Sequence, residues 1–479
     1  MLSECRLCDK VRTMLKRISL LLIILFLKAN LLLASDEQAG PGVSLLKPFQ
    51  KEDRVFILAP HPDDEAIACA GIIQQALKAG AKVKVVYLTN GDHNQFAFIV
   101  YEKRITLRKG EFIHMGEVRR QEAIKAMGTL GLTEGDLVFL GYPDFGTFTI
   151  FNRHWEESRP FKSFLTRISA VPYKENISFG SPYKGESILR DLEGVLLGFK
   201  PNEIFVSHPA DVNADHKALY LFLQVALRDL SGSLPALQVH PYLVHCAGWP
   251  LPRHYHPELA LTPPGQFLAD TQINWSENEL TSVELAKKRQ AILCYKSQTQ
   301  SSAFYLLSFA RKNELFGDYP LFSLERQASL KEKTVSFSGF SDMFKDSEID
   351  MLGLENLMKE DGQVSYAVVD NALLIRLEKK RTLSRSFSVI FYLFGYSQKT
   401  PFSKMPKLRI YTRNTKFRVF DGEKRIKTEE IVLNIHSNIL FLKIPLQLLG
   451  DPEFILSAIK AHAGILPITA TGFRRIEIR

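Results

Sequence analysis

The chain has 479 residues, of which 46% are hydrophobic and 24% charged, and this composition excludes a disordered protein. Its length favours two domains, and its formal charge of +9 raises the hypothesis of an anionic partner. However, the Lys and Arg residues are scattered beyond the start of the chain and no nucleic-acid-binding motif accompanies them, so we expect no nucleic-acid partner.

Residues 1–35 are predicted to form a signal peptide or an N-terminal anchor. Lys16 and Arg17 precede an apolar run over 18–27, and small residues follow near Ala34, which is the layout of a secretory signal. The run is short for a spanning helix, so cleavage is favoured over an uncleaved anchor that associates with a membrane. We therefore expect an exported protein that is periplasmic, secreted or membrane-anchored. The three later cysteines do not make a disulfide framework: Cys69, Cys246 and Cys294.

Residues 50–325 are predicted to form an α/β domain. Short β-rich runs such as "RVFILA", "KVKVVYLT", "DLVFLGY" and "EIFVS" alternate with helical stretches such as "EVRRQEAIKAMGTLGL" and "SILRDLEGVLLGF". Near-continuous apolar strands indicate a Rossmann-like, mostly parallel sheet with helices on both faces. Ligands bind beyond the carboxyl ends of such strands. Polar clusters follow the predicted strands at 61–65, 90–93, 142–144 and 208–216.

Residues 330–479 are predicted to form an antiparallel β-sandwich domain. From 334 onwards the sequence alternates with period two between turn residues, and helical signals are scarce. A carbohydrate-binding role and a stabilising or docking role both remain open for this domain. Its alternating aromatic residues fit sugar binding and core packing equally well: Phe391, Tyr392, Phe394 and Tyr396.

Two segments at predicted strand ends have the residue types of a metal site. "HPDDE" offers the imidazole of His61 and adjacent carboxylates, and "SHPADVNADHKALY" offers His216 at the start of the next helix. Two histidines and one aspartate would leave an open position for water on a zinc ion. Taken singly, Asp63 could cap a helix and His216 could be a packing histidine. Two such segments at the ends of strands in one sheet favour a site.

The sequence also resembles the PIG-L/LmbE-like family of zinc-dependent N-acetylglucosaminyl de-N-acetylases. The resemblance covers about 54–316 and is based on "APHPDDEAIACAG", "TNGD", "RRQEAIKAMGTLG", "FLGYPD", "SHPADVNADHKALY", "YLVHCAGWP", "YKSQ" and "ELF". It implies removal of acetyl groups from N-acetylglucosamine-containing glycolipids and glycosides. It also implies a metal cofactor, Zn²⁺ with Fe²⁺ as the alternative, and an N-acetylated sugar as the binding partner.

The resemblance assigns roles to individual residues. It implies three metal ligands: His61, Asp64 and His216. Asp63 is the implied general base, and Arg119 and Asp144 match positions that contact the sugar substrate.

One position departs from the family pattern. Many relatives have a histidine three residues before the last metal ligand, where this chain has Asn213. Asparagine donates a hydrogen bond to an oxyanion but does not change protonation state near neutral pH. Either Asp63 therefore carries the proton in both directions or His245 acts as the acid, and strand-end packing is the expected use of His208.

The expected function is that of a metal-dependent hydrolase that removes the N-acetyl group from an N-acetylglucosamine-containing glycolipid, glycoside or polysaccharide and releases acetate. The alternative is a catalytically decayed glycan-binding or structural cell-envelope protein. A dinucleotide-binding enzyme is disfavoured because no G-x-G-x-x-G follows the first predicted strand.

Overall fold

The computed structural model describes residues 42–94, 99–101, 108–268, 273–327, 335–338, 362–379, 383, 387–463 and 466–479. The predicted signal or anchor at 1–35 lies outside these residues. None of the helices within them combines the length and the apolar character needed to cross a bilayer.

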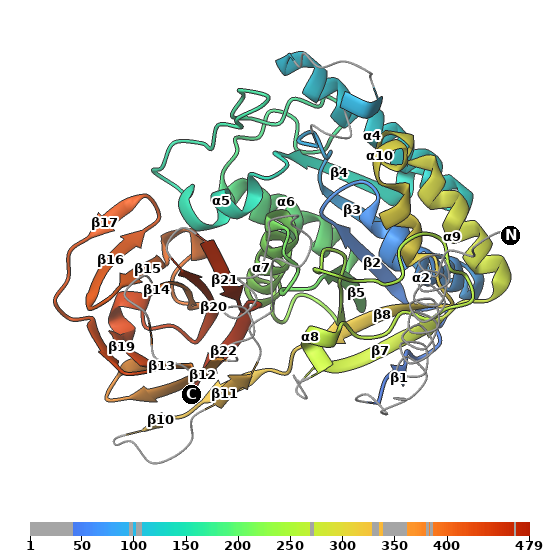
Figure 1. The fold of residues 1–479 in the computed structure, drawn as a ribbon. Helices are drawn as coiled ribbons and strands as arrows, with labels where there is room; N and C mark the ends of the chain where they lie inside the picture. Colours follow the sequence, from blue (N-terminus) through green and yellow to red (C-terminus); the bar gives the residue numbers. More distant parts are fainter. Residues whose placement is uncertain are drawn as a thin grey trace, which may run out of the picture. The chain divides into compact units, whose positions relative to one another are not determined.

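The first part of the described chain is built on an eight-stranded sheet (Figure 1). Its strand order is β1-β7-β8-β6-β5-β2-β3-β4, and the five consecutive strands β6, β5, β2, β3 and β4 run parallel. Strand β8 pairs antiparallel with both β6 and β7. The strand bounds are Ser44–Leu45 (β1), Arg54–Ala59 (β2), Lys82–Thr89 (β3), Leu137–Tyr142 (β4), Glu203–Ser207 (β5), Gln238–Tyr242 (β6), Asn274–Glu279 (β7) and Asn313–Asp318 (β8).

Helices cover both faces of this sheet, which confirms the predicted Rossmann-like class. Along β2, Val55 and Ile57 join one core cluster while Phe56 and Leu58 join the other, because successive side chains of a strand point to opposite faces. Burial on both sides explains the continuous apolar run. One cluster contains residues of α2 (Asp64–Ala79), α4 (Lys109–Leu130), α9 (Ser282–Cys294) and α10 (Lys296–Leu306). The other contains residues of α5 (Thr147–Arg153), α6 (Gly185–Phe199) and α7 (Ala214–Asp229), and the short α8 spans Gly265–Leu268.

The C-terminal part is a β-sandwich, as predicted. One sheet has the order β10-β12-β13-β19-β18 with β11 paired to β12, and the other has the order β17-β16-β15-β14-β20-β22-β9 with β21 paired to β20. A shared core of residues from both sheets lies between them. The bounds are Phe322–Leu324 (β9), Arg326–Gln327 (β10), Val335–Ser338 (β11), Gly362–Val369 (β12), Ala372–Lys379 (β13), Phe387–Tyr396 (β14), Lys407–Arg413 (β15), Lys416–Asp421 (β16), Lys424–Ile426 (β17), Val432–His436 (β18), Ile439–Pro445 (β19), Phe454–Ala463 (β20), Leu466–Ala470 (β21) and Arg474–Ile478 (β22).

Helix α5 anchors the sandwich to the α/β sheet. Phe151 of α5 is fully buried, and its ring centroid lies 5.4 Å from that of Phe394 and 5.5 Å from that of Phe402. The hydroxyl of Tyr396 donates a hydrogen bond of 2.5 Å to Asp229 at the end of α7. Phe391 instead faces the core between the two sheets. Packing on the two sides of β14 therefore explains the alternating aromatic residues of this strand.

Candidate functional site

The loop from β2 into α2 presents three polar residues to one cavity. The backbone N–H of His61 donates to Asp64 at 3.0 Å, which fixes the first turn of the loop. Asp63 has φ +134°, a conformation that L side chains rarely adopt and that often marks a functional position. The carboxylate of Asp63 makes no helix-capping hydrogen bond and lies 3.3 Å from the guanidinium of Arg119. Helix capping therefore does not explain this residue.

The loop from β5 into α7 brings His216 to the same place. The side-chain oxygen of Asn213 accepts a hydrogen bond from the N–H of Asp215 at 2.8 Å and so caps α7. Asp211 accepts from the backbone N–H of His245 at 2.8 Å, and its carboxylate lies 3.1 Å from Nδ1 of His216. Asp211 therefore orients His216 and holds the loop after β6 against it.

Four side chains from these loops converge. Ligand atoms of His61, Asp64, His216 and His245 all lie within 4.8 Å of one another. Oδ2 of Asp64 is 3.3 Å from Nδ1 of His61 and 3.2 Å from Nε2 of His216. A second group shares His61, whose Nε2 lies 3.2 Å from Asp144 and 3.3 Å from Asp215. The predicted set of two histidines and one aspartate is thus brought together, with His245 beside it.

The electrostatics of the cluster favour a cation. Burial alone lowers the pKa of His216, but the charges of Asp211 and Asp64 outweigh burial and raise that pKa to about 9. Burial raises the pKa of Asp63 to about 7 against the opposing charge of Arg119. The same carboxylates would attract a metal ion. A metal ion binds the neutral imidazole, so it would take the place of the proton on His216.

The donor set fits a divalent metal ion. Among the described residues, neither ring nitrogen of the buried His216 has a hydrogen-bond partner of proper geometry. Two or three imidazoles with one carboxylate are the ligands that zinc prefers, and Asp211 stands behind His216 as an orienting carboxylate.

A cavity of about 520 Å³ opens onto these residues. It is lined by His61, Asp63, Asp64, Ile67, His93, Asn94, Arg119, Asp144, Phe145, Asn213, Val244, His245, Gln298, Ser302, Tyr305 and Leu306. Every predicted catalytic and substrate-binding residue is in this lining, so one small molecule could meet all of them.

The family comparison covers the segment that carries both loops. Residues 56–227 match the GlcNAc-PI de-N-acetylase family, PIG-L. The matched segment includes all three predicted metal ligands. Residues 56–227 are a PIG-L family domain.

Solved structures resemble the chain only distantly. The A40926 pseudoaglycone deacetylase is 14% identical, with 56% of this chain and 96% of that chain covered and a TM-score of 0.35. The N,N'-diacetylchitobiose deacetylase from Pyrococcus horikoshii is 18% identical, with coverage of 57% and 86% and a TM-score of 0.34. The 4-carboxy-2-hydroxymuconate hydratase from Pseudomonas putida KT2440 is 16% identical, with coverage of 56% and 97% and a TM-score of 0.35. No curated protein matches the chain.

Arg119 in the PIG-L domain is a buried positioning residue. Its terminal nitrogens donate to the carbonyl oxygens of Gly91 at 3.0 Å and Pro62 at 2.7 Å, in addition to the contact with Asp63. A Cβ at Gly91 would lie 2.1 Å from this guanidinium, and Gly91 has φ +69°, so glycine is required there. Arg119 thereby ties the loops after β2 and β3 together.

Asp144 in the PIG-L domain lies at the end of β4 and accepts a hydrogen bond from the N–H of His93 at 3.0 Å. Its second carboxylate oxygen is buried, lies near His61 and has no hydrogen-bond partner in the described chain. Asp144 also lines the cavity, where its carboxylate could accept a hydrogen bond from a ligand hydroxyl.

Sequence reasoning did not assign Asp211 or the role of Asp215. Asp215 accepts from the backbone N–H groups of Phe145 at 2.6 Å and Thr147 at 3.1 Å, so its oxygens are engaged in holding the start of α5. The acidic residues of "SHPADVNADH" can be read from the sequence, but the residues that they contact lie on loops distant in sequence.

Two further polar residues near the site, His208 and the Glu65 that ends "HPDDE", are accounted for by packing or pairing. His208 is fully buried, and burial lowers its pKa to about 3, which agrees with the expected packing role. Glu65 accepts a hydrogen bond from the hydroxyl of Tyr295 and one from the N–H of Asp63 at 3.1 Å. Neither residue is therefore a free base at the cavity.

Proposed function

We propose that this protein is a metal-dependent hydrolase that removes the N-acetyl group from an N-acetylglucosamine-containing glycolipid, glycoside or polysaccharide and releases acetate. The observation that carries the proposal is the convergence of His61, Asp64 and His216 in a PIG-L family domain, with Asp63 lining the cavity that opens onto His61 and Asp64. Asp63 has a strained backbone and no capping role, which supports a chemical one.

The metal ion would be held by His61, Asp64 and His216, with Zn²⁺ favoured by the donors and Fe²⁺ as the alternative. A divalent ion bound there would polarise the amide carbonyl and lower the pKa of a water molecule. Asp211 would keep the His216 ring oriented through its contact with Nδ1.

The chain's own residues then serve amide hydrolysis. Asp63, held in place by Arg119, accepts the proton of the attacking water while the water oxygen bonds to the carbonyl carbon. The C–N bond then breaks, the amine nitrogen receives a proton from Asp63 or from His245, and acetate leaves. The side-chain N–H₂ of Asn213 is left to donate to the oxyanion, since its oxygen caps α7.

The substrate side of the cavity is polar. Asp144 lines the cavity and could accept a hydrogen bond from a sugar hydroxyl, and Phe145 beside it is 53% exposed and offers an apolar face. We further propose that the protein is exported, which the charged start and the apolar run within 1–35 support. Export would place the enzyme with cell-envelope or extracellular glycans.

The test combines metal analysis with acetate release. The purified protein is assayed on N-acetylglucosamine, chitin oligosaccharides and N-acetylglucosaminyl-phosphatidylinositol, before and after chelation and re-addition of Zn²⁺ or Fe²⁺. We expect about one ion per chain, loss of acetate release on chelation and recovery on re-addition. His216→Ala should lose the ion, whereas His114→Ala should keep it because His114 is exposed on α4.

Two results would contradict the proposal. Full metal occupancy in His216→Ala would refute the ligand assignment. A metal-loaded protein that releases no acetate from any of these sugars would instead favour the decayed glycan-binding alternative.

A further inference from the structure

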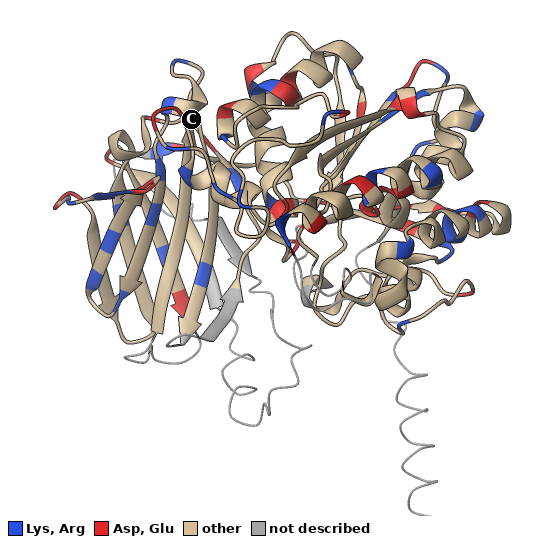
Figure 2. Ribbon diagram, turned by 90° about the horizontal axis from the view of Figure 1, so that it is seen from above, with Lys and Arg blue, Asp and Glu red and all other residues tan. Residues whose placement is uncertain are grey.

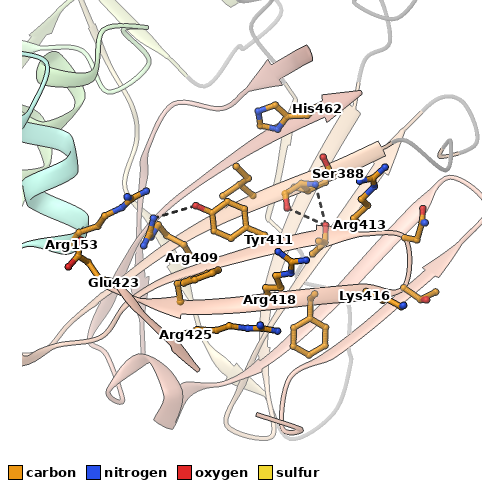
Figure 3. A pocket seen from close by; sticks show the side chains of 17 residues that line it. Arg153, Ser388, Arg409, Tyr411, Arg413, Lys416, Arg418, Glu423, Arg425 and His462 are labelled. Carbon is orange, nitrogen blue, oxygen red and sulfur yellow. Dashed lines mark hydrogen bonds between the residues drawn. The ribbon is translucent and has the colours of Figure 1, made fainter. Parts of the chain in front are cut away.

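A second hollow lies on the sandwich and shares no lining residue with the cavity of the PIG-L site. It has a volume of about 1160 Å³ and is formed over β14, β15, β16 and β17 (Figure 3). Ile410 and Val419 of these strands face the sandwich core, so Arg409, Tyr411 and Arg418 face the opposite way, into the hollow. We call this surface the β14–β17 groove.

The groove is strongly basic. It is lined by six cationic side chains and one acidic one: Arg153, Arg409, Arg413, Lys416, Arg418, Arg425 and Glu423. Within the described part of the chain, none of the six makes an ion pair with a carboxylate. Figure 2 shows Lys and Arg at several positions along the sandwich strands and few acidic residues among them. Such a surface concentrates anions near it.

Arg409 is the residue that distinguishes the groove from an ordinary solvated surface. It is only 4% exposed, and its guanidinium donates to the hydroxyl of Tyr411 at 3.3 Å and to the carbonyl oxygen of Gly422. Its Nε is buried without a hydrogen-bond partner, and the nearby charge of Arg153 repels it. A buried cation without a counter-charge is unfavourable, and an anion in the groove would relieve this cost.

Helix α5 connects the groove to the PIG-L cavity. At its start, Thr147 donates its backbone N–H to Asp215 at 3.1 Å, beside His61. At its end, Arg153 lines the groove. Seven residues at 1.5 Å per residue place these two ends about 9 Å apart. The groove and the loops of the PIG-L site are therefore linked through one short helix.

We propose that the β14–β17 groove binds a polyanionic glycan, a sugar polymer that carries carboxylates or phosphates. That the same polymer supplies the N-acetylated sugar to the cavity rests on the proposed function. The groove exceeds the volume of a typical small-molecule site, which favours a polymer segment over a single small anion.

Two other polyanions fit less well. A membrane surface calls for exposed apolar side chains beside the cations, and none of the exposed large hydrophobic residues of the described chain lines the groove. Single-stranded nucleic acid calls for a row of aromatic stacking faces. Tyr411 and Phe420 instead pack edge to face against each other, with centroids 5.5 Å apart.

Binding is tested on the full chain with probes of defined charge. Hyaluronan oligosaccharides supply carboxylates together with N-acetylglucosamine, and a poly(glycerol phosphate) chain bearing N-acetylglucosamine supplies phosphates. Chitin oligosaccharides of equal length are the neutral control. We expect at least one anionic probe to bind about tenfold or more tightly than chitin at low salt, with the difference shrinking at about 0.5 M salt because screening weakens exposed charges. The probe that binds more tightly identifies the anionic group.

The groove variant combines Arg413→Gln, Arg418→Gln and Arg425→Gln, three exposed residues. It should bind the anionic probe about tenfold or more weakly and with a shallower salt dependence. The control variant removes three exposed charges elsewhere, Lys78→Gln, Lys162→Gln and Lys287→Gln, and should bind as the wild type does. Both variants should keep the melting temperature of the wild type.

Unchanged binding in the groove variant would overturn the proposal. Tighter binding of single-stranded RNA or of anionic vesicles than of either glycan, lost in the same variant, would overturn it in favour of that partner. If the groove binds the glycan but the wild type releases no acetate from any N-acetylated sugar, the groove stands and the proposed function fails. If acetate is released but binding does not depend on the groove, only the groove proposal fails.

Discussion

Replacing Asp63 with asparagine tests the proposed chemistry most directly. Asparagine tolerates a positive φ about as well as aspartate does, so the strained turn at φ +134° should persist. No helix-capping hydrogen bond is lost, because the Asp63 side chain makes none. The loss is the charge-assisted contact of 3.3 Å with Arg119, which still donates to the carbonyls of Gly91 and Pro62. We expect a stability loss of about 1–3 kcal/mol and a folded, metal-binding protein.

The effect on turnover should be much larger. Removal of a positioned general base costs about 10²- to 10⁴-fold in rate. At 1.36 kcal/mol per tenfold, this corresponds to about 2.7–5.4 kcal/mol in the activation barrier. The loss should fall on kcat, with a small change in KM, because the amide introduced by Asp63→Asn would keep the shape of the cavity but accept no proton.

The assay measures acetate release at saturating metal, well below the melting temperature of the variant. Arg119→Gln is the matched comparison, since it keeps the base but removes the group that holds it, and it should lose less activity than Asp63→Asn. Near wild-type turnover by metal-loaded Asp63→Asn on a confirmed substrate would refute the assignment of Asp63 as the base.

Three further predictions concern stability and location. Phe151→Ala should lower the free energy of unfolding by about 3–5 kcal/mol, because Phe151 is fully buried between α7 and the sandwich, and denaturant titration giving a loss below about 1 kcal/mol would contradict the anchoring role of α5. Burial and the neighbouring Asp229 raise the pKa of Glu193 from its ordinary value to about 7, so the folded state favours the protonated carboxyl. The stability contributed by Glu193 is thus present below about pH 4.5 and lost as pH rises through 7, and Glu193→Gln should raise the melting temperature at pH 8 but not at pH 4.5; equal shifts at both pH values would argue against this. Cell fractionation with N-terminal sequencing should find the chain outside the cytoplasm, either beginning near Ser35 or anchored through 1–35, and a full-length cytoplasmic protein would exclude both forms.

The fold class could be predicted from the sequence because its signals are local. The apolar run of β2 reflects burial on both faces of one strand, and the period-two alternation after 334 reflects strands with one face toward a core. The short α5 was not predicted, because seven residues inside a Phe- and Pro-containing excursion carry too little periodicity. Its position follows from Phe151, which is held by aromatic rings of α7 and of the sandwich.

The residue types of the site could also be predicted from the sequence. His61 and Asp64 lie three residues apart at the end of one strand, and His216 follows another strand. The sequence alone does not show which residues these side chains contact. Arg119 reaches Asp63 across 56 residues, and Asp211 meets the backbone of His245 across 34. These contacts depend on the strand order β6-β5-β2-β3, which brings distant loops to one edge of the sheet.

In the basic groove, too, one feature follows from the sequence and another only from the fold. The sequence by itself determined that Arg409, Tyr411 and Arg413 share one face of a strand, because the strand repeat is two residues. Only the tertiary structure decided that Arg418 of the next strand, Arg425 of the one beyond and Arg153 of α5 gather around the same hollow. Charges that are scattered along the chain are concentrated by strand pairing and by the packing of α5, since the distance between charges is set by the fold and not by their separation in sequence.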